Sequence, residues 1–276
     1  MKKRTEKSAT DERRQTRTTT DRMMGLRMIF TGLTIVLVFF ARGGWCDILF
    51  KDDFETNTIA NREIYDTLGT PMAADAGSLK FLYSITHASS ATGLECTLPI
   101  APDAPDEREI EMNFLGGGSD MSNSLFICYA CGPGAGMSLP VMPAGNLPNS
   151  RTGYIIRFIR HGDATNEVKF YRNDSGTAVE LANETGLPSN PIKTLRKVVI
   201  VHQKSGEHMI RAEFDTGIRL ARSFEFSDST YPPNNIQRGL ELIAKGHVST
   251  SLLAELRTDT WIVSDRWLPA GEPLQK

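Results

Sequence analysis

The chain has 276 residues and a formal net charge of −2, with 40% hydrophobic residues, 23% charged residues and only four cysteines. This composition argues against disordered, collagen-like and disulfide-scaffold proteins. The charge is uneven, since residues 1–46 hold ten Lys/Arg and four Asp/Glu (+6), whereas residues 47–276 hold 21 and 29 (−8). Phosphate binding needs clustered basic residues, so the acidic part argues against a nucleic-acid partner.

The N-terminal 46 residues are typical of a basic leader with a signal peptide. Residues 28–41 form an apolar run whose only polar members are threonines, shorter than the roughly 20 residues that span a bilayer. Gly44 and Cys46 are small residues at the −3 and −1 positions of a cleavage site before Asp47. An uncleaved signal anchor is the alternative, and it would be the only membrane contact. Either way, residues 47–276 are expected to be secreted, periplasmic or in the cell envelope.

From Asp47 onward the sequence alternates short apolar runs with clusters of Gly, Pro, Asn and Asp, and shows almost no helical period. This pattern predicts one all-β domain, residues 47–276, built as an antiparallel β-sandwich of the jelly-roll type. The predicted strands are 48–54, 78–84, 92–98, 108–115, 123–130, 153–160, 167–172, 177–182, 195–204, 207–214, 218–226, 238–244 and 260–268.

Alternation within the strands assigns their faces. Ile210, Ala212 and Phe214 are expected to face the core, with Met209 and Arg211 on the opposite face. Turn residues at 172–176, 203–206 and 215–217 predict hairpins.

A long loop is expected at residues 131–151, which contain four Gly and four Pro and can form neither a strand nor a helix interior. Long loops on a sandwich are common sites of ligand contact. Cys128 and Cys131 have the spacing of a metal knuckle, but a structural zinc needs four ligands and no second pair exists. We therefore interpret them as small half-buried residues at a strand end.

Three segments carry a family resemblance: residues 48–54 (ILFKDDF), 77–80 (GSLK) and 261–267 (WIVSDRW). Together they resemble the opening and closing strands of concanavalin A-like lectin/glucanase domains, and the resemblance covers nearly all of residues 47–268. Laminin-G-like domains and 3-keto-disaccharide hydrolase-like domains look nearest. One departure is Ile64-Tyr65, where the family usually has a tryptophan. The resemblance implies a concanavalin A-like sandwich and a carbohydrate or cell-surface ligand.

Glu109 and Glu111 are the candidate catalytic residues. They alternate along one predicted strand with Asn113, so all three share a face. Retaining glycosidases need two carboxyl groups about 5–5.5 Å apart, and the run faintly resembles the catalytic strand of sandwich glucanases. Asn113 stands where that strand carries its second carboxylate, and a solvated acidic strand is the alternative interpretation.

Asp53 and Asp265 are the candidate metal ligands. The resemblance places them on the first and last strands, which it expects side by side, and implies a structural calcium held by carboxylates. The alternative is that these aspartates accept hydrogen bonds from backbone amides at turns and strand ends.

Tyr129, Arg157 and Trp261 are the candidate ligand-binding residues. The aromatic rings can stack on a sugar, although rings on sandwich strands often belong to the core. The sequence thus predicts a secreted or envelope-associated domain that binds carbohydrate. A glycoside hydrolase or 3-keto-disaccharide hydrolase-like enzyme, with Arg157 orienting the substrate, and a structural envelope protein without a small-molecule site are the two alternatives.

Overall fold

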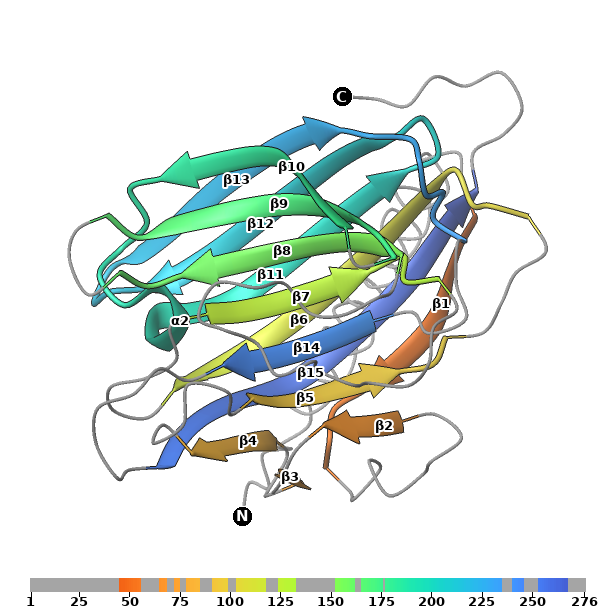
Figure 1. Cartoon of the computed structure of the whole chain (residues 1–276). Coiled ribbons are helices and arrows are strands. Elements are labelled where there is room, and N and C mark those ends of the chain that lie inside the picture. The colour runs from red at the N-terminus through yellow and green to blue at the C-terminus, as the bar shows by residue number, and fades with distance from the viewer. Residues whose placement is uncertain are drawn as a thin grey trace, which may run out of the picture. The chain divides into compact units, whose positions relative to one another are not determined.

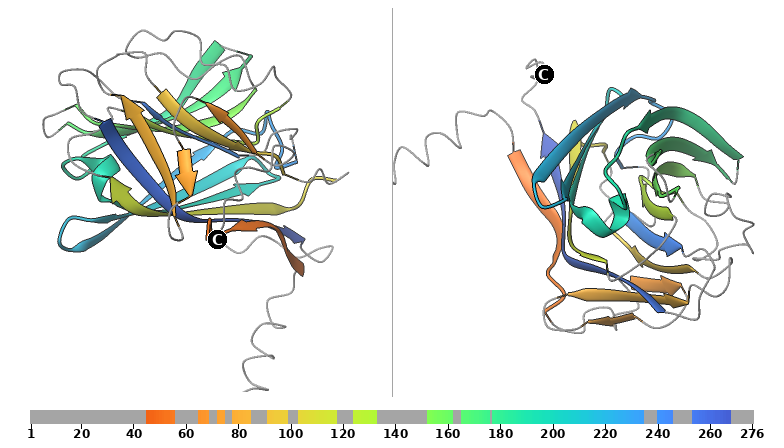
Figure 2. Two further views of the ribbon diagram at one scale, coloured as in Figure 1. Left: turned by 90° about the horizontal axis from the view of Figure 1, so that it is seen from below. Right: turned by 90° about the vertical axis from the view of Figure 1, so that its left-hand side faces the viewer.

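The computed structural model describes residues 45–55, 65–68, 72–74, 78–84, 91–98, 103–117, 124–132, 152–161, 165–175, 177–234, 240–245 and 253–267. The strands in these ranges form two antiparallel sheets that pack face to face (Figure 1, Figure 2). The fold is therefore an all-β sandwich, as the sequence predicts.

Sheet A is the eight-stranded sheet, with the order β13-β12-β11-β6-β15-β4-β3 and β1 paired with the later part of β15. It contains both the first and the last strand of the sandwich, which lie side by side as expected. Its strands are β1 (Trp45–Asp52), β3 (Met72–Ala74), β4 (Leu79–Ser84), β6 (Glu107–Gly117), β11 (Leu195–Gln203), β12 (Glu207–Asp215), β13 (Arg219–Ser227) and β15 (Leu253–Trp267).

Sheet B is the seven-stranded sheet, with the order β10-β9-β8-β7-β14-β5-β2. It lies in front of sheet A in Figure 1. Its strands are β2 (Tyr65–Leu68), β5 (Ala91–Cys96), β7 (Ser124–Tyr129), β8 (Gly153–Ile159), β9 (Glu167–Asp174), β10 (Thr177–Thr185) and β14 (Leu240–Lys245).

All thirteen predicted strands are present, with ends shifted by up to a few residues. The exception is β15, which begins at Leu253 instead of residue 260, because register shifts around Thr258 and Thr260 interrupt its alternation. The short strands β2 and β3 and the single helical turn α2 (Pro191–Thr194) are additions to the prediction. The side chain of Asn190 caps α2 by accepting a hydrogen bond from the Lys193 amide.

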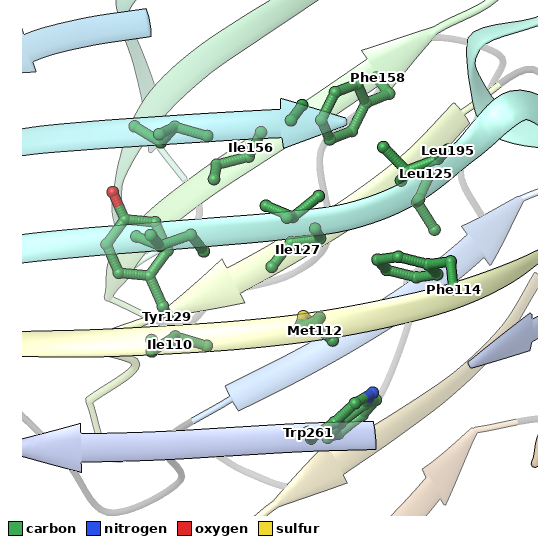
Figure 3. Packing of buried hydrophobic residues seen from close by; sticks show 14 of the residues in the cluster. Ile110, Met112, Phe114, Leu125, Ile127, Tyr129, Ile156, Phe158, Leu195 and Trp261 are labelled. Atoms are coloured by element: carbon green, nitrogen blue, oxygen red, sulfur yellow. The ribbon is translucent and has the colours of Figure 1, made fainter. Parts of the chain in front are cut away.

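The predicted faces of β12 are confirmed, because Ile210, Ala212 and Phe214 are buried while Met209 and Arg211 lie on the outward face. The inward side chains of both sheets form one hydrophobic core (Figure 3). The predicted hairpin turns also form. Gly206, at φ 92°, donates to the Gln203 carbonyl, and Gly217 donates to the Asp215 carboxylate.

Several sequence predictions fall outside the described residues. Residues 1–44 of the predicted leader, with the apolar run 28–41, and residues 133–151 of the predicted loop are among them, whereas Trp45 and Cys46 begin β1. Among the described residues, no helix has the length and apolar character needed to cross a membrane.

A buried ion pair joins the two inner strands β6 and β15 of sheet A. It lies near the start of β6 and the end of β15. Nε and Nη2 of Arg108 donate to the two carboxylate oxygens of Asp265 at 2.7 and 2.8 Å, and Nη1 donates to the Pro233 carbonyl at 2.5 Å. Arg108 is 3% exposed and Asp265 is 1% exposed. Bidentate geometry and a third acceptor compensate the guanidinium for its lost hydration.

The start of β8 depends on Gly153. Its φ of 136° is a conformation that L-residues rarely adopt, and a Cβ there would lie 2.9 Å from the carbonyl oxygens of Tyr129 and Ala130. Both carbonyls belong to backbone, so neither can move aside easily. Gly153 therefore allows β8 to approach the end of β7.

We expect Gly153→Ala to destabilise the domain by about 2 kcal/mol or more, because backbone strain and steric overlap add. The matched control is Gly217→Ala, where φ is also positive (93°) but nothing lies within 4 Å of the added Cβ. Urea unfolding of both variants gives the comparison. Equal losses of stability would show that the contact with Tyr129 and Ala130 contributes nothing.

Candidate functional site

The outward face of sheet B is turned toward the viewer in Figure 1. On this face, β7, β8, β9 and β10 carry a group of polar side chains. Strand register places Arg157 between Phe126 and Lys169, and one row away it places Tyr171 beside Ile155. We call this group the polar strip. Its members are Ser124, Arg157, Glu167, Lys169, Tyr171 and Glu180.

Arg157 occupies the inner end of the polar strip. Its Nε and Nη2 both donate to the Ser124 hydroxyl at 3.1 Å, and its guanidinium carbon lies 5.3 Å from the centroid of the Phe126 ring. Burial lowers the pKa of Arg157 below its ordinary value, although a hydrogen bond to Tyr171 and the charge of Glu167 oppose this shift. Burial likewise raises the pKa of Tyr171. Arg157 thus remains a fixed cation above an aromatic ring.

The outer end of the polar strip is open to solvent. Lys169 Nζ lies 3.7 Å from Glu167 and 3.5 Å from Glu180, and His161 Nε2 lies 2.9 Å from Glu167. Exposure of the carboxylate side chains rises from 14% at Glu167 to 46% at Glu180. The strip therefore offers a guanidinium, an ammonium, two carboxylates and a phenol to one surface. Each of these groups can bond a hydroxyl group.

Glu109 and Glu111 lie on the other sheet, on the outward face of β6. Strand register flanks Glu111 with Val199 and Ile262, and Glu109 with Val201 and Ser264. None of these four cross-strand neighbours is aromatic. The pair does share a face, as the alternation predicts, but that face is turned away from the polar strip.

The two carboxyl groups have opposite pKa shifts. Burial, and then the neighbouring Glu107 and Glu111 charges, raise the pKa of Glu109. Burial also acts to raise the pKa of Glu111, but hydrogen bonds from Lys197 and Asn113 outweigh it and the pKa falls. Lys197 Nζ lies 2.7 Å from Glu111 Oε2, and Asn113 donates to Oε1 at 3.0 Å. Both oxygens of Glu111 are therefore already bonded.

Asp53 and Asp265 are not brought together. β1 pairs with β15 so that Asp52 lies opposite Trp261 and Asp47 lies opposite Asp265. Asp53 is therefore at the far end of the pair, where its carboxylate accepts a hydrogen bond from the Glu55 amide, while Asp265 is held by Arg108. Among the described residues, no group of three or more His, Cys, Asp or Glu side chains could hold a metal ion. These two residues do not fit a calcium site.

Tyr129 and Trp261 both lie inside the sandwich (Figure 3). The Trp261 ring packs edge-on against Phe54 with centroids 5.5 Å apart, and its Nε1 donates to the Thr258 hydroxyl at 2.8 Å. The Tyr129 hydroxyl lies 3.0 Å from His208 Nδ1. Of the three candidate ligand-binding residues, only Arg157 lies on an outward face.

An inward row of polar side chains crosses sheet A, and sequence analysis did not identify it. Strand register aligns His208 with His202, His202 with Arg108, and Arg108 with Asp265. We call these four residues the buried row. The two imidazole rings stack at 4.2 Å with 22° between their planes, and the rings of Tyr129 and Tyr154 pack against them from sheet B.

The histidines of the buried row differ in their hydrogen bonds. His208 Nε2 lies 3.0 Å from the Asp228 carbonyl, which can only accept, so Nε2 donates and neutral Nδ1 accepts from Tyr129. His202 Nε2 has no partner within the described structure. Burial lowers the pKa of His208 to about 4 and that of His202 well below its ordinary value. Both rings are therefore neutral at pH 7.

Residues 228–234, which we call the strap, cover one end of the buried row. The Tyr154 hydroxyl donates to Asp228 and accepts from the Tyr231 amide, and Arg172 Nη1 donates to Asp228 Oδ2 at 2.6 Å. The Tyr231 hydroxyl donates to Asp174 at 2.7 Å. Hydrogen bonds from Thr230, Tyr154 and Arg172 outweigh the effect of burial and lower the pKa of Asp228 to about 2. Side-chain contacts thus hold the strap to sheet B.

Solved structures of lectin-like domains share this fold. Arcelin-5, a lectin-like defence protein from Phaseolus vulgaris, has a TM-score of 0.53 at 9% identity, with 82% of this chain and 100% of that chain covered. The exoplasmic/lumenal domain of VIP36, in its Ca²⁺/Man3GlcNAc-bound form, has a TM-score of 0.52 at 10% identity, with 76% and 86% covered. The CBM2 module of the evolved Dit of Lactobacillus casei BL23 phage J-1 has a TM-score of 0.52 at 9% identity, with 82% and 99% covered.

The chain therefore has the concanavalin A-like fold of legume lectin-like domains, and the resemblance inferred from the sequence is confirmed at the level of fold. No protein-family model matches the chain, and no curated protein matches its sequence.

We expect Asp265→Ala to destabilise the domain by about 3–5 kcal/mol, because it leaves Arg108 buried without its counter-charge. This corresponds to a fall of roughly 10 °C in melting temperature for a domain of this size. Asp53→Ala, at the exposed end of β1, should leave the melting temperature nearly unchanged.

Melting with added calcium and with a chelator separates the ion pair from a metal site. The melting temperature of the wild type should be the same in both, since Asp265 is bonded to Arg108. A calcium-dependent rise that disappears in Asp265→Ala would contradict this account. Replacing both partners, as Arg108→Leu/Asp265→Leu, should recover part of the lost stability.

Proposed function

We propose that this chain is a carbohydrate-binding domain of the concanavalin A-like fold, directed to an extracytoplasmic compartment by its leader. The observation that carries the proposal is the polar strip on the outward face of sheet B. The lectin-like structures that share the fold support it. The VIP36 structure is that of an exoplasmic/lumenal domain in its Ca²⁺/Man3GlcNAc-bound form.

The chemistry of the polar strip suits a sugar. A hydroxyl group both donates and accepts, so neighbouring hydroxyls can bond a carboxylate and an ammonium at the same time. Lys169 stands between Glu167 and Glu180 and provides such an alternating set. Hydrogen bonds to charged groups contribute about 1.5–3 kcal/mol each. A few well-placed groups on a scaffold of strands are therefore enough for orientation and selectivity.

The strip also divides into a fixed part and an accessible part. Arg157 is held by Ser124, Phe126 and Tyr171, so ligand binding costs little side-chain entropy there. Lys169 and Glu180 are more exposed and would contact the ligand directly. A mutation at the accessible part therefore tests binding with little effect on the fold.

We expect Lys169→Ala and Glu180→Ala to weaken glycan binding about 10-fold to 100-fold, the loss of one charged hydrogen bond. Binding is measured on a glycan array and by pull-down on insoluble polysaccharides, with and without calcium. The matched control is Arg211→Ala, which removes an exposed cation from the outward face of sheet A.

Two results would overturn this proposal. One is the absence of binding to any glycan by folded wild-type protein, which would favour a structural envelope protein. The other is equal loss of glycan binding in Lys169→Ala and Arg211→Ala, which would show that the glycan does not bind specifically at the polar strip.

Glycoside hydrolysis by Glu109 and Glu111 is a second candidate, favoured by their opposite pKa shifts, because a retaining pair needs one protonated and one ionised carboxyl group. Lys197 and Asn113 occupy the Glu111 carboxylate, however, and aliphatic side chains flank it. We therefore expect no turnover of aryl glycosides above the blank. Turnover that is lost in Glu111→Gln but kept in Glu213→Gln would show that the domain is a glycoside hydrolase and not only a binding domain.

A further inference from the structure

The strap and the buried row form one assembly at the end of the sandwich. The strap supplies the Asp228 carbonyl to His208 Nε2, and the Tyr231 backbone acts on the His202 ring in the direction that raises its pKa. The Pro233 carbonyl accepts from Arg108. Three residues of the strap therefore cap three residues of the buried row.

A proton on either ring has no good place in this assembly. Protonated His208 would carry an N–H on both ring nitrogens, so Nδ1 would donate to the Tyr129 oxygen and the Tyr129 O–H would lose its acceptor. Protonated His202 would place an N–H at Nε2, where no acceptor lies, beside Arg108 on one side and His208 on the other. The closed assembly is compatible only with neutral rings.

The other charged groups around the rings are already paired. On β6 and β15, Arg108 is bonded to Asp265. On β9, Arg172 is bonded to Asp174 and to Asp228 of the strap. The remaining titratable neighbours are the Tyr129, Tyr154 and Tyr231 phenols and the Cys131 thiol. Burial raises the pKa of each of the three phenols, and Cys131 contributes to the shift at Tyr129. Of these carboxylates, Asp228 acts to raise the pKa of both rings, but burial outweighs this effect.

The strap is the segment of this assembly that can detach with the smallest loss of hydrogen bonds between strands. It follows β13 as irregular chain, and Pro232 and Pro233 have no N–H with which to join a sheet. The Asp228 amide donates to the Gly206 carbonyl, and the other hydrogen bonds of the strap among the described residues involve side chains. The strands beneath it are held by continuous ladders. Water can therefore reach both imidazole rings when the strap leaves, without loss of a strand.

We propose that the His202–His208 pair is an acid-sensitive closure: when the two rings take up protons, the strap is released from the end of the sandwich. This inference rests on the contacts of the strap and is independent of carbohydrate binding.

The linkage between proton binding and opening predicts how the ratio of open to closed form changes with pH. The pKa of each ring is lower in the closed form than its ordinary value of 6.5, so the open form binds more protons below pH 6.5. The ratio of open to closed form then rises about 10-fold per histidine for each pH unit, until His208 begins to titrate near pH 4. Between pH 6.5 and 5 the two rings together give about a 250-fold rise, because each ring is already half protonated in the open form at pH 6.5. Asp228, with its pKa lowered to about 2, keeps its charge throughout this range.

Hydrogen exchange of the Thr230 and Tyr231 amides measures this opening, because both amides are bonded in the closed form. On the full-length chain, and after correction for the intrinsic rate at each pH, exchange should rise steeply from pH 6.5 to 5. Exchange in β11 and the emission of buried Trp261 should not change over this range. A parallel change in β11 or Trp261 would mean unfolding of the whole sandwich and would overturn the proposal.

Variants of the two rings provide the decisive comparison. His202→Phe keeps an aromatic ring in the stack and removes one site, so the rise should fall to about 15-fold. His202→Phe/His208→Gln keeps a donor for Asp228 and an acceptor for Tyr129, and its strap should show no rise. His161→Gln, on the exposed outer side of sheet B, is the matched control and should behave like the wild type. An acid response that survives in the double variant would overturn the proposal.

Discussion

The buried guanidinium of Arg108 is the constraint on which the interior of this sandwich depends. It sits on the strand between β11 and β15, it is almost fully buried, and it requires acceptors on two sides. Asp265 supplies one side, and the Pro233 carbonyl supplies the other. Because a buried charge is tolerated only when it is fully bonded, this single side chain fixes the register of β6 against β15 and the position of the strap.

The same requirement explains the polar character of this end of the core. The rings of Tyr129, Tyr154, His202 and His208 fill the space between the sheets, and the polar atoms of Tyr129, Tyr154 and His208 bond one another or the strap. At the other end of β6, Met112, Phe114 and Trp261 form an apolar interior (Figure 3). The sandwich therefore combines a hydrophobic part that provides stability with a hydrogen-bonded part that responds to its surroundings.

Much of the fold could be predicted from the sequence, because alternation is a local property. The faces of β12 follow directly from residues 207–214, and the turn at 203–206 identifies the β11–β12 hairpin. That hairpin register already places His202 beside His208. The rest of the buried row could not be found, because it needs β6 beside β11 and β15, pairings between residues far apart in the chain. Alternation gives no information on the order of non-consecutive strands.

Less of the candidate site could be predicted from the sequence, because the orientation and the partners of its residues depend on strand register and sheet order. β7 is buried along its whole length and mostly apolar, so the sequence could not show that Tyr129 points inward while Phe126 points outward. Trp261 lies just after the register shifts of β15, which change the faces of the residues that follow. Arg157 was predicted as a residue that orients the substrate near Glu109 and Glu111, but it lies on the other sheet. Its partners Ser124 and Tyr171 come from two other strands and emerge only from the sheet order.

The close approach at Gly153 has a consequence for how this domain can vary. The Gly132 amide donates to the Thr152 carbonyl at 3.0 Å, and Gly153 then packs directly on the end of β7. The two ends of the intervening segment are thus held together by the framework itself, whatever residues the segment contains. A connection closed in this way tolerates changes in length and composition at small entropic cost. The β7–β8 connection is accordingly a natural place to graft foreign peptide sequences, with the sandwich serving as a display scaffold.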